Sequence, residues 1–144
     1  MDMNRLEPLR GVRILIVEDE ALIAEELRVR LSRCGAQIVG VLGTAAAAAD
    51  TALETRPDVM LMDIRLRGRN DGIDAVHRVR QQFAVAVVYL TALSDQVTLA
   101  RARDAGICAY VTKPFEERQL VVAIEMAIEA HQQEIRRSPR HSAE

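Results

Sequence analysis

Short apolar runs recur five times along the chain, and each is followed by a segment with helical spacing of its apolar residues. The runs are rich in β-branched residues and cover 12–17, 37–42, 58–63, 85–90 and 107–111. The helical segments cover 20–33, 44–54, 71–82, 95–105 and 115–131. In the first of them, one face is expected to carry Leu22, Ile23, Leu27 and Leu31. The alternation predicts five repeats of a strand followed by a helix.

Strands that alternate with helices favour one parallel sheet, because each connection between parallel strands crosses over a face of the sheet. Right-handed crossovers then predict a doubly wound α/β fold with helices on both faces. For five strands and five helices the expected strand order is 2-1-3-4-5. We expect one domain over residues 11–131, with an N-terminal tail at 1–10 and a polar C-terminal tail at 132–144.

Composition narrows the classes of function. The chain has 144 residues, 49% of them hydrophobic and 28% charged, as in a globular protein with a substantial core. Its net charge of −2 gives no general attraction to nucleic acid or to an anionic membrane, and no segment is long enough to cross a bilayer. Cys34 and Cys108 lack metal-site spacing and are expected to be reduced thiols. These features predict a cytoplasmic protein without nucleic-acid or membrane partners.

Acidic residues stand where the first and third apolar runs end. Glu18 and Asp19 follow the first run, and Asp63 closes the third. In strand order 2-1-3-4-5, the ends of strands 1 and 3 flank the crevice where such sheets bind ligands. Three converging carboxylates would repel one another unless a cation lay between them. Mg²⁺ prefers oxygen ligands and usually binds one or two carboxylates together with a phosphate.

The fourth and fifth strands bring two further groups to this edge of the sheet. Thr91 follows the fourth run, and Lys113 follows the fifth. A hydroxyl, an ammonium group and a divalent cation can together stabilise the charge of a transferring phosphoryl group. An aspartate is an established nucleophile for that group, so the pattern indicates phosphoryl transfer to Asp63.

Four motifs at successive strand ends carry a resemblance to a known family. They are VEDE at 17–20, LMDI at 61–64, YLTAL at 89–93 and YVTKPF at 110–115. In this order and spacing they resemble the receiver domain of two-component response regulators, over about residues 12–131. The resemblance implies that Asp63 accepts a phosphoryl group from a sensor histidine kinase or a phosphotransfer protein. It also implies that the domain catalyses only its own phosphorylation and dephosphorylation.

The resemblance implies a metal site as well. Mg²⁺ or Mn²⁺ would be bound by Asp19, Asp63 and the main-chain carbonyl of Arg65, with Glu18 behind these ligands. Many receivers have a second aspartate in place of Glu18, and many have a proline in place of Arg67, in a loop about one residue shorter. These differences concern the geometry of the loop and the identity of the kinase rather than the phosphoryl chemistry.

Three residues have further roles that the resemblance implies. Thr91 and Lys113 would stabilise the phosphoryl group, and Thr91 and Tyr110 would form a switch that responds to it. The Lys113–Pro114 peptide would be cis, which a bond before proline tolerates at modest cost. Tyr110 could equally be a half-buried aromatic residue of the core.

Other functions remain open on the same fold. A Mg²⁺-dependent phosphatase that acts on external substrates would need a second aspartate two residues after the nucleophile, where this chain has Arg65. A nucleotide or flavin binder would need a loop rich in Gly or in Ser and Thr after the first strand, and the loop here is acidic. The chain could also be the receiver fragment of a longer regulator.

The last helical segment is apolar over a wider arc than packing on one sheet requires. Val122 and Met126 widen its apolar stripe, and exposed apolar patches tend to mark partner sites. Together with Val97, Arg101 and Tyr110 they are predicted to contact a downstream signalling protein or a second copy of the chain. Burial of the stripe under the C-terminal tail is the alternative.

Overall fold

Strands and helices alternate along the chain. The structure is a computed structural model and describes residues 7–66, 71–92, 95, 100–101 and 108–137. Its strands are β1 (Arg13–Val17), β2 (Gln37–Leu42), β3 (Val59–Asp63), β4 (Ala86–Thr91) and β5 (Ala109–Thr112). Its helices within the described ranges are α2 (Ala21–Arg33), α3 (Ala48–Thr55), α4 (Asp71–Gln82) and α6 (Glu117–Arg137). The fifth predicted helix, 95–105, falls mostly on residues outside the described ranges.

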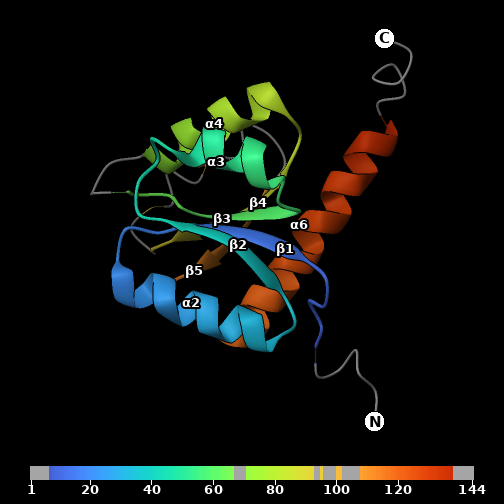
Figure 1. Cartoon of the computed structure of the whole chain (residues 1–144). Helices are drawn as coiled ribbons and strands as arrows, with labels where there is room; N and C mark the ends of the chain where they lie inside the picture. Colours follow the sequence, from blue (N-terminus) through green and yellow to red (C-terminus); the bar gives the residue numbers. More distant parts are fainter. Residues whose placement is uncertain (1–6, 67–70, 93–94, 96–99, 102–107, 138–144) are drawn as a thin grey trace.

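The five strands form one parallel sheet in the order β2-β1-β3-β4-β5, which confirms the predicted doubly wound topology. Val17, the last residue of β1, lies opposite Met62 of β3. Asp63, the last residue of β3, lies opposite Leu90 of β4. The carboxyl ends of β1, β3 and β4 therefore meet at one edge of the sheet, the edge at which β1 connects to α2 (Figure 1).

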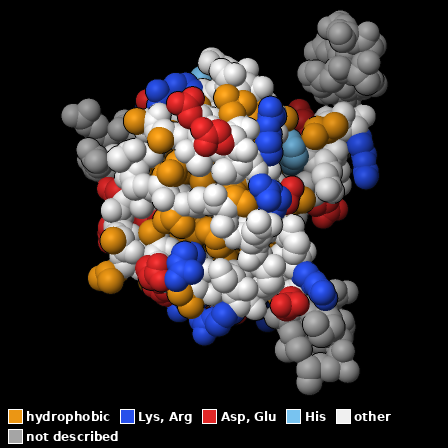
Figure 2. Space-filling model, viewed as in Figure 1, with side chains coloured by type: hydrophobic (Ala, Val, Ile, Leu, Met, Phe, Trp, Pro, Cys, Tyr) orange, Lys and Arg blue, Asp and Glu red, His pale blue; other side chains and the backbone are white. Residues whose placement is uncertain are grey.

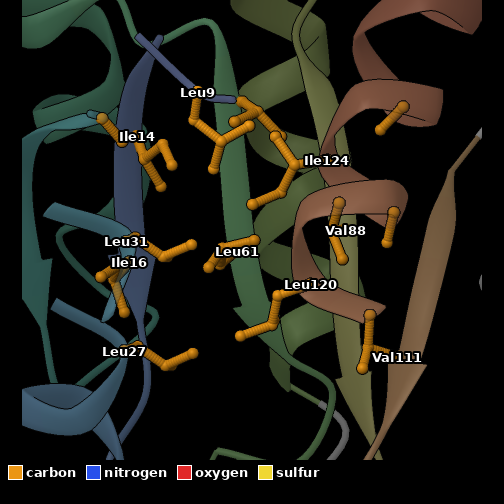
Figure 3. Packing of buried hydrophobic residues seen from close by; sticks show 14 of the residues in the cluster. Leu9, Ile14, Ile16, Leu27, Leu31, Leu61, Val88, Val111, Leu120 and Ile124 are labelled. Atoms are coloured by element: carbon orange, nitrogen blue, oxygen red, sulfur yellow. The ribbon is translucent and has the colours of Figure 1, made fainter. Parts of the chain in front are cut away.

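Helices cover both faces of the sheet. α3 and α4 pack on one face, and α2 and α6 pack on the other (Figure 1). Figure 3 shows the second of these two cores, where side chains such as Leu31, Leu61 and Ile124 meet between the sheet and its helices. All residues of β3 and β4 are buried, because these interior strands have a helix layer on each side. This burial explains their almost unbroken apolar sequence.

Two local expectations need correction or extension. Leu22 is 87% exposed, so its predicted place on the buried face of α2 is wrong. At about 100° per residue it points about 180° away from Leu31, while Ala24 and Leu27 lie close to Leu31 and are buried with it. At the other end of the chain, α6 continues to Arg137, so part of the segment 132–144 is helical. Its last turns extend beyond the sheet (Figure 1).

The edge strand β2 is less covered than the interior strands. Its residues are only partly buried, and Val41 is 42% exposed. Hydrophobic side chains form a band across the middle of this face of the molecule, between helix layers that carry charged side chains (Figure 2). Within the described ranges, none of the helices combines the length and the apolar character that crossing a membrane requires.

Candidate functional site

Three carboxylates converge where β1 and β3 end. Oxygen atoms of Glu18, Asp19 and Asp63 all lie within 4.8 Å of one another. Glu18 is 2% exposed and Asp63 is 5% exposed, because both residues directly follow or end interior strands. Asp19 is half-buried and lies closer to solvent. The structure therefore brings together the three acids that the sequence places in the crevice.

Lys113 joins two of these acids. Its Nζ lies 2.9 Å from Oε1 of Glu18 and 3.3 Å from Oδ2 of Asp63. The main-chain N–H of Lys113 donates to the carbonyl of Thr91 (2.7 Å), which fixes the start of the β5–α6 connection beside β4. The Lys113–Pro114 peptide is cis, as the resemblance implies. The ammonium group of Lys113 thus pairs with two of the three acids, and acidic groups outnumber basic ones in this cluster.

The charges in the crevice perturb one another. Burial, and next the neighbouring Asp63 carboxylate, raise the pKa of Glu18 to about 7, although Lys113 acts in the opposite direction. Burial alone would lower the pKa of Lys113, but Glu18 and Asp63 outweigh it and the pKa is raised. Lys113 therefore stays charged at neutral pH, while Glu18 is only partly ionised until another cation compensates it.

Thr91 and Tyr110 lie on neighbouring strands of the sheet. Thr91 is buried at the end of β4, and its Oγ1 donates to the carbonyl of Ala92 at 3.2 Å. Tyr110, on β5, lies opposite Tyr89 of β4 and is 42% exposed. In the described state the hydroxyl of Thr91 is therefore engaged with the backbone, and the ring of Tyr110 lies at the surface.

The loop after β3 adds contacts that the sequence did not reveal. The main-chain N–H of Arg65 donates to Oδ1 of Asp63 at 3.0 Å. The side chain of Arg65 forms an ion pair with Asp95, a carboxylate that is 3% exposed. In the sequence, Asp95 only marks the start of the predicted helix 95–105. An acid four residues after the strand-end threonine is the one available signal, and a helix cap explains it as well.

Gly72 is a second residue whose importance the sequence did not reveal. It lies in the first turn of α4, directly against the backbone of β3. A Cβ atom at this position would lie 2.1 Å from the carbonyl oxygen of Asp63. The absence of a side chain is thus what allows α4 to pack on the end of β3. The pair Asp71-Gly72 in the sequence was a possible signal, but it also fits an ordinary helix start.

Comparison with known proteins assigns the family. Residues 14–125, from β1 into α6, match the response regulator receiver domain. The chain belongs to the response regulator receiver family. Acidic residues of receiver domains bind Mg²⁺, and the acids of this receiver fit that role, because they offer three hard oxygen ligands within reach of one ion.

Two curated relatives illustrate the similarity of this receiver. It is 42% identical over 116 residues to the transcriptional regulatory protein PdtaR of Mycobacterium tuberculosis, a match that covers 81% of this chain and 56% of that protein. It is 37% identical over 112 residues to the DNA-binding response regulator MtrA of Mycolicibacterium paratuberculosis, covering 78% and 49%. The chain thus spans about half the length of the curated relatives it matches.

Solved structures agree with this assignment. The receiver resembles the signal receiver domain of a modulated diguanylate cyclase from Desulfovibrio desulfuricans G20, with a TM-score of 0.77 and 34% identity over 85% of this chain and 97% of the other. It also resembles the receiver domain of PhyR from Erythrobacter litoralis, with a TM-score of 0.71 and 30% identity over 84% and 92%. Each of these single receiver domains matches more than four fifths of this chain, so the fold described here is that of one receiver domain.

The predicted partner face of the receiver lies apart from the carboxylates. A largely apolar groove of about 690 Å³ runs between β5 and α6, and its lining includes Tyr110, Val122 and Met126. Val122 is 43% exposed and Met126 is 61% exposed. Arg101 is exposed, and Val97 lies outside the described residues. The partner role of this face stays a prediction.

Proposed function

We propose that Asp63 accepts a phosphoryl group from a sensor histidine kinase or a phosphotransfer protein, in a step that depends on Mg²⁺ or Mn²⁺. The observation that carries this proposal is the convergence of Glu18, Asp19 and Asp63 with the ammonium group of Lys113. Receiver domains interact with histidine kinases, which supports the choice of donor. The phosphoryl group would be a switch signal, and the domain would catalyse only its own phosphorylation and dephosphorylation.

In the proposed reaction, a carboxylate oxygen of Asp63 attacks the phosphorus atom of a phosphohistidine. The new O–P bond forms as the N–P bond breaks, and the leaving imidazole nitrogen keeps the electron pair and takes up a proton. Lys113 lies close enough to Asp63 to neutralise charge on the transferred group. Mg²⁺, held by Asp19, Asp63 and the carbonyl of Arg65 with Glu18 behind them, would stabilise the remaining negative charge.

The signal would then pass from Asp63 to the surface. A phosphoryl group offers new acceptor oxygens, and the hydroxyl of Thr91, buried on the neighbouring strand, is a donor that could leave the Ala92 carbonyl for them. Movement of Thr91 would open space for Tyr110 to turn inward. Such a change requires contacts that differ between the two states, and the phosphoryl oxygens would supply them.

The output of the proposed switch is a protein contact through the groove between β5 and α6, with a downstream signalling protein or a second copy of the chain. A net charge of −2 supports a protein partner rather than nucleic acid or a membrane surface. We assign the receiver to residues 11–131, between tails at 1–10 and 132–144. A partner of histidine kinase domains would work in the cytoplasm.

The test is incubation with Mg²⁺ and acetyl phosphate, followed by intact-mass measurement. Wild type should gain the mass of one phosphoryl group, and a chelator of divalent cations should prevent the gain. D63N should keep its fold by circular dichroism and gain no mass. D50N removes an exposed carboxylate of α3 and should behave as wild type. Equal mass gain in D63N would overturn the assignment of Asp63.

The rival function, a phosphatase for external substrates, makes a different prediction. It requires repeated release of phosphate from an added phosphomonoester, with Asp63 regenerated each time. The proposed receiver should instead consume acetyl phosphate and leave a phosphomonoester such as p-nitrophenyl phosphate untouched. Sustained turnover of the monoester by wild type but not by D63N would favour the phosphatase.

A further inference from the structure

Asp95 is a buried carboxylate whose two oxygens are both engaged. It lies four residues after Thr91 and is 3% exposed. Its Oδ1 accepts a hydrogen bond from Nε of Arg65, and its Oδ2 accepts one from the main-chain N–H of Ala92 at 3.2 Å. The N–H of Asp95 in turn donates to the carbonyl of Ala92 at 3.0 Å. The side chain of Asp95 is thus held beside the end of β4 by one guanidinium group and one backbone amide.

The two residues that supply these donors, Arg65 and Ala92, adjoin the proposed phosphoryl site. The main-chain N–H of Arg65 donates to Oδ1 of Asp63 at 3.0 Å, so Arg65 lies directly against the proposed phosphoryl acceptor. Ala92 immediately follows Thr91, on the strand that pairs with β3 and places Leu90 opposite Asp63. The hydroxyl of Thr91 also contacts Ala92, through the carbonyl. Asp95 therefore uses donors that belong to two residues next to Asp63, one following β3 and one following β4.

A phosphoryl group on Asp63 would be a second anion in need of these donors. It carries up to two negative charges and three acceptor oxygens. Two anions within one set of donors repel each other, so one of them must give up its contacts. The carboxylate of Asp95 occupies the donors in the described state, and phosphorylation would displace it.

We propose that Asp95 is an internal competitor of the phosphoryl group for the guanidinium group of Arg65 and the N–H of Ala92. This inference rests on the proposed function of Asp63. Asp95 and Arg65 are positioning residues: their ion pair holds the unphosphorylated arrangement and weakens the hold of the site on a phosphoryl group.

The variant D95N tests this competition directly. Asparagine keeps the size of the side chain and an oxygen for the N–H of Ala92, but it removes the charge that holds Arg65. With Mg²⁺ present, the full chain should bind beryllofluoride, a mimic of the phosphoryl group, about fivefold more tightly in D95N than in wild type. D50N removes an equal charge from an exposed position on α3 and should stay within about twofold of wild type.

A double-mutant cycle with R65Q separates competition from a merely structural role. In the R65Q background, D95N should change beryllofluoride affinity by about twofold or less, because no guanidinium group remains to be released. A D95N effect of the same size in both backgrounds would overturn the role of Arg65. Affinity of D95N equal to wild type would overturn the competition as a whole.

A readout on the wild type keeps the test decisive if D95N folds poorly. The Nε–H signal of Arg65 in NMR spectra should shift when beryllofluoride is added with Mg²⁺, as its partner changes from Asp95 to the fluorides. An unchanged signal in the beryllofluoride complex would overturn the inference. Failure of the proposed function looks different, because wild type would then gain no phosphoryl mass from acetyl phosphate at all.

Discussion

The crevice between β1 and β3 and the groove between β5 and α6 differ in what holds their residues in place. In the crevice, Glu18 and Asp63 are buried at the ends of interior strands and are linked through Lys113. In the groove, Val122 and Met126 are 43% and 61% exposed on a helix that packs with its other side. Substitutions in the crevice should therefore disturb stability and chemistry together, whereas substitutions in the groove should disturb association alone.

The largest effect is expected at the close contact behind the crevice. G72A would place a Cβ atom 2.1 Å from the carbonyl oxygen of Asp63, and neither backbone can move without disturbing β3 or α4. We expect a loss of about 3 kcal/mol in the free energy of unfolding, measured by urea denaturation. G43A is the matched control, because a Cβ atom there has no neighbour within 4 Å, and it should change stability by less than about 0.5 kcal/mol. Equal stabilities of the two variants would contradict the contact.

Glu18 is expected to make the free energy of unfolding depend on pH, with a smaller effect than that of G72A. Its pKa is raised from 4.5 to about 7 in the folded protein, so the folded state binds a proton more tightly than the unfolded state does. Its stabilising contribution is therefore full below about pH 4.5 and is lost as the pH rises through about 7. The complete shift corresponds to roughly 3 kcal/mol, which is the upper limit of the loss.

The measurement is the free energy of unfolding between pH 4.5 and 7.5 without divalent cations. Wild type should lose stability over this range relative to E18Q, whose side chain cannot ionise. Mg²⁺ should reduce the loss, because its binding favours the ionised carboxylates. Parallel pH profiles for wild type and E18Q would show that Glu18 does not titrate in this range.

The sequence alone predicted part of the site and part of the packing. Glu18, Asp63 and Lys113 were predictable as neighbours, because each directly follows or ends a strand and the strand order brings those ends together. The prediction for Leu22 was wrong because this residue lies about 180° around α2 from Leu31, so the apolar residues of the helix do not all share one face. Local patterns locate the elements well where the apolar repeat is regular, and they fail at single positions near the helix ends.

Contacts between loops were beyond the reach of the sequence. Arg65 and Asp95 are 30 residues apart, and neither belongs to a strand whose register could place it. Their ion pair depends on the conformations of two connections, which apolar periodicity does not encode. The contact of Gly72 with Asp63 likewise depends on how closely α4 approaches β3. The grouping of charged side chains at the strand ends was predictable, whereas the Arg65–Asp95 ion pair and the close approach of Gly72 were visible only in three dimensions.

The smallest change in stability is expected from a substitution in the groove between β5 and α6. It is also the sharpest test of the difference between this groove and the crevice. M126D places a charge on a side chain that is 61% exposed, so stability should change by less than about 0.5 kcal/mol and phosphorylation of Asp63 should be unaffected. Association with a partner or a second copy should weaken at least about tenfold, because a carboxylate would be buried against apolar lining.

I135D is the matched control: Ile135 is 52% exposed on the same helix but does not line the groove. Light scattering with and without beryllofluoride would measure self-association of both variants. If I135D abolished it while M126D left it at full strength, the contact would lie along the last turns of α6, and the groove would lose its assigned role.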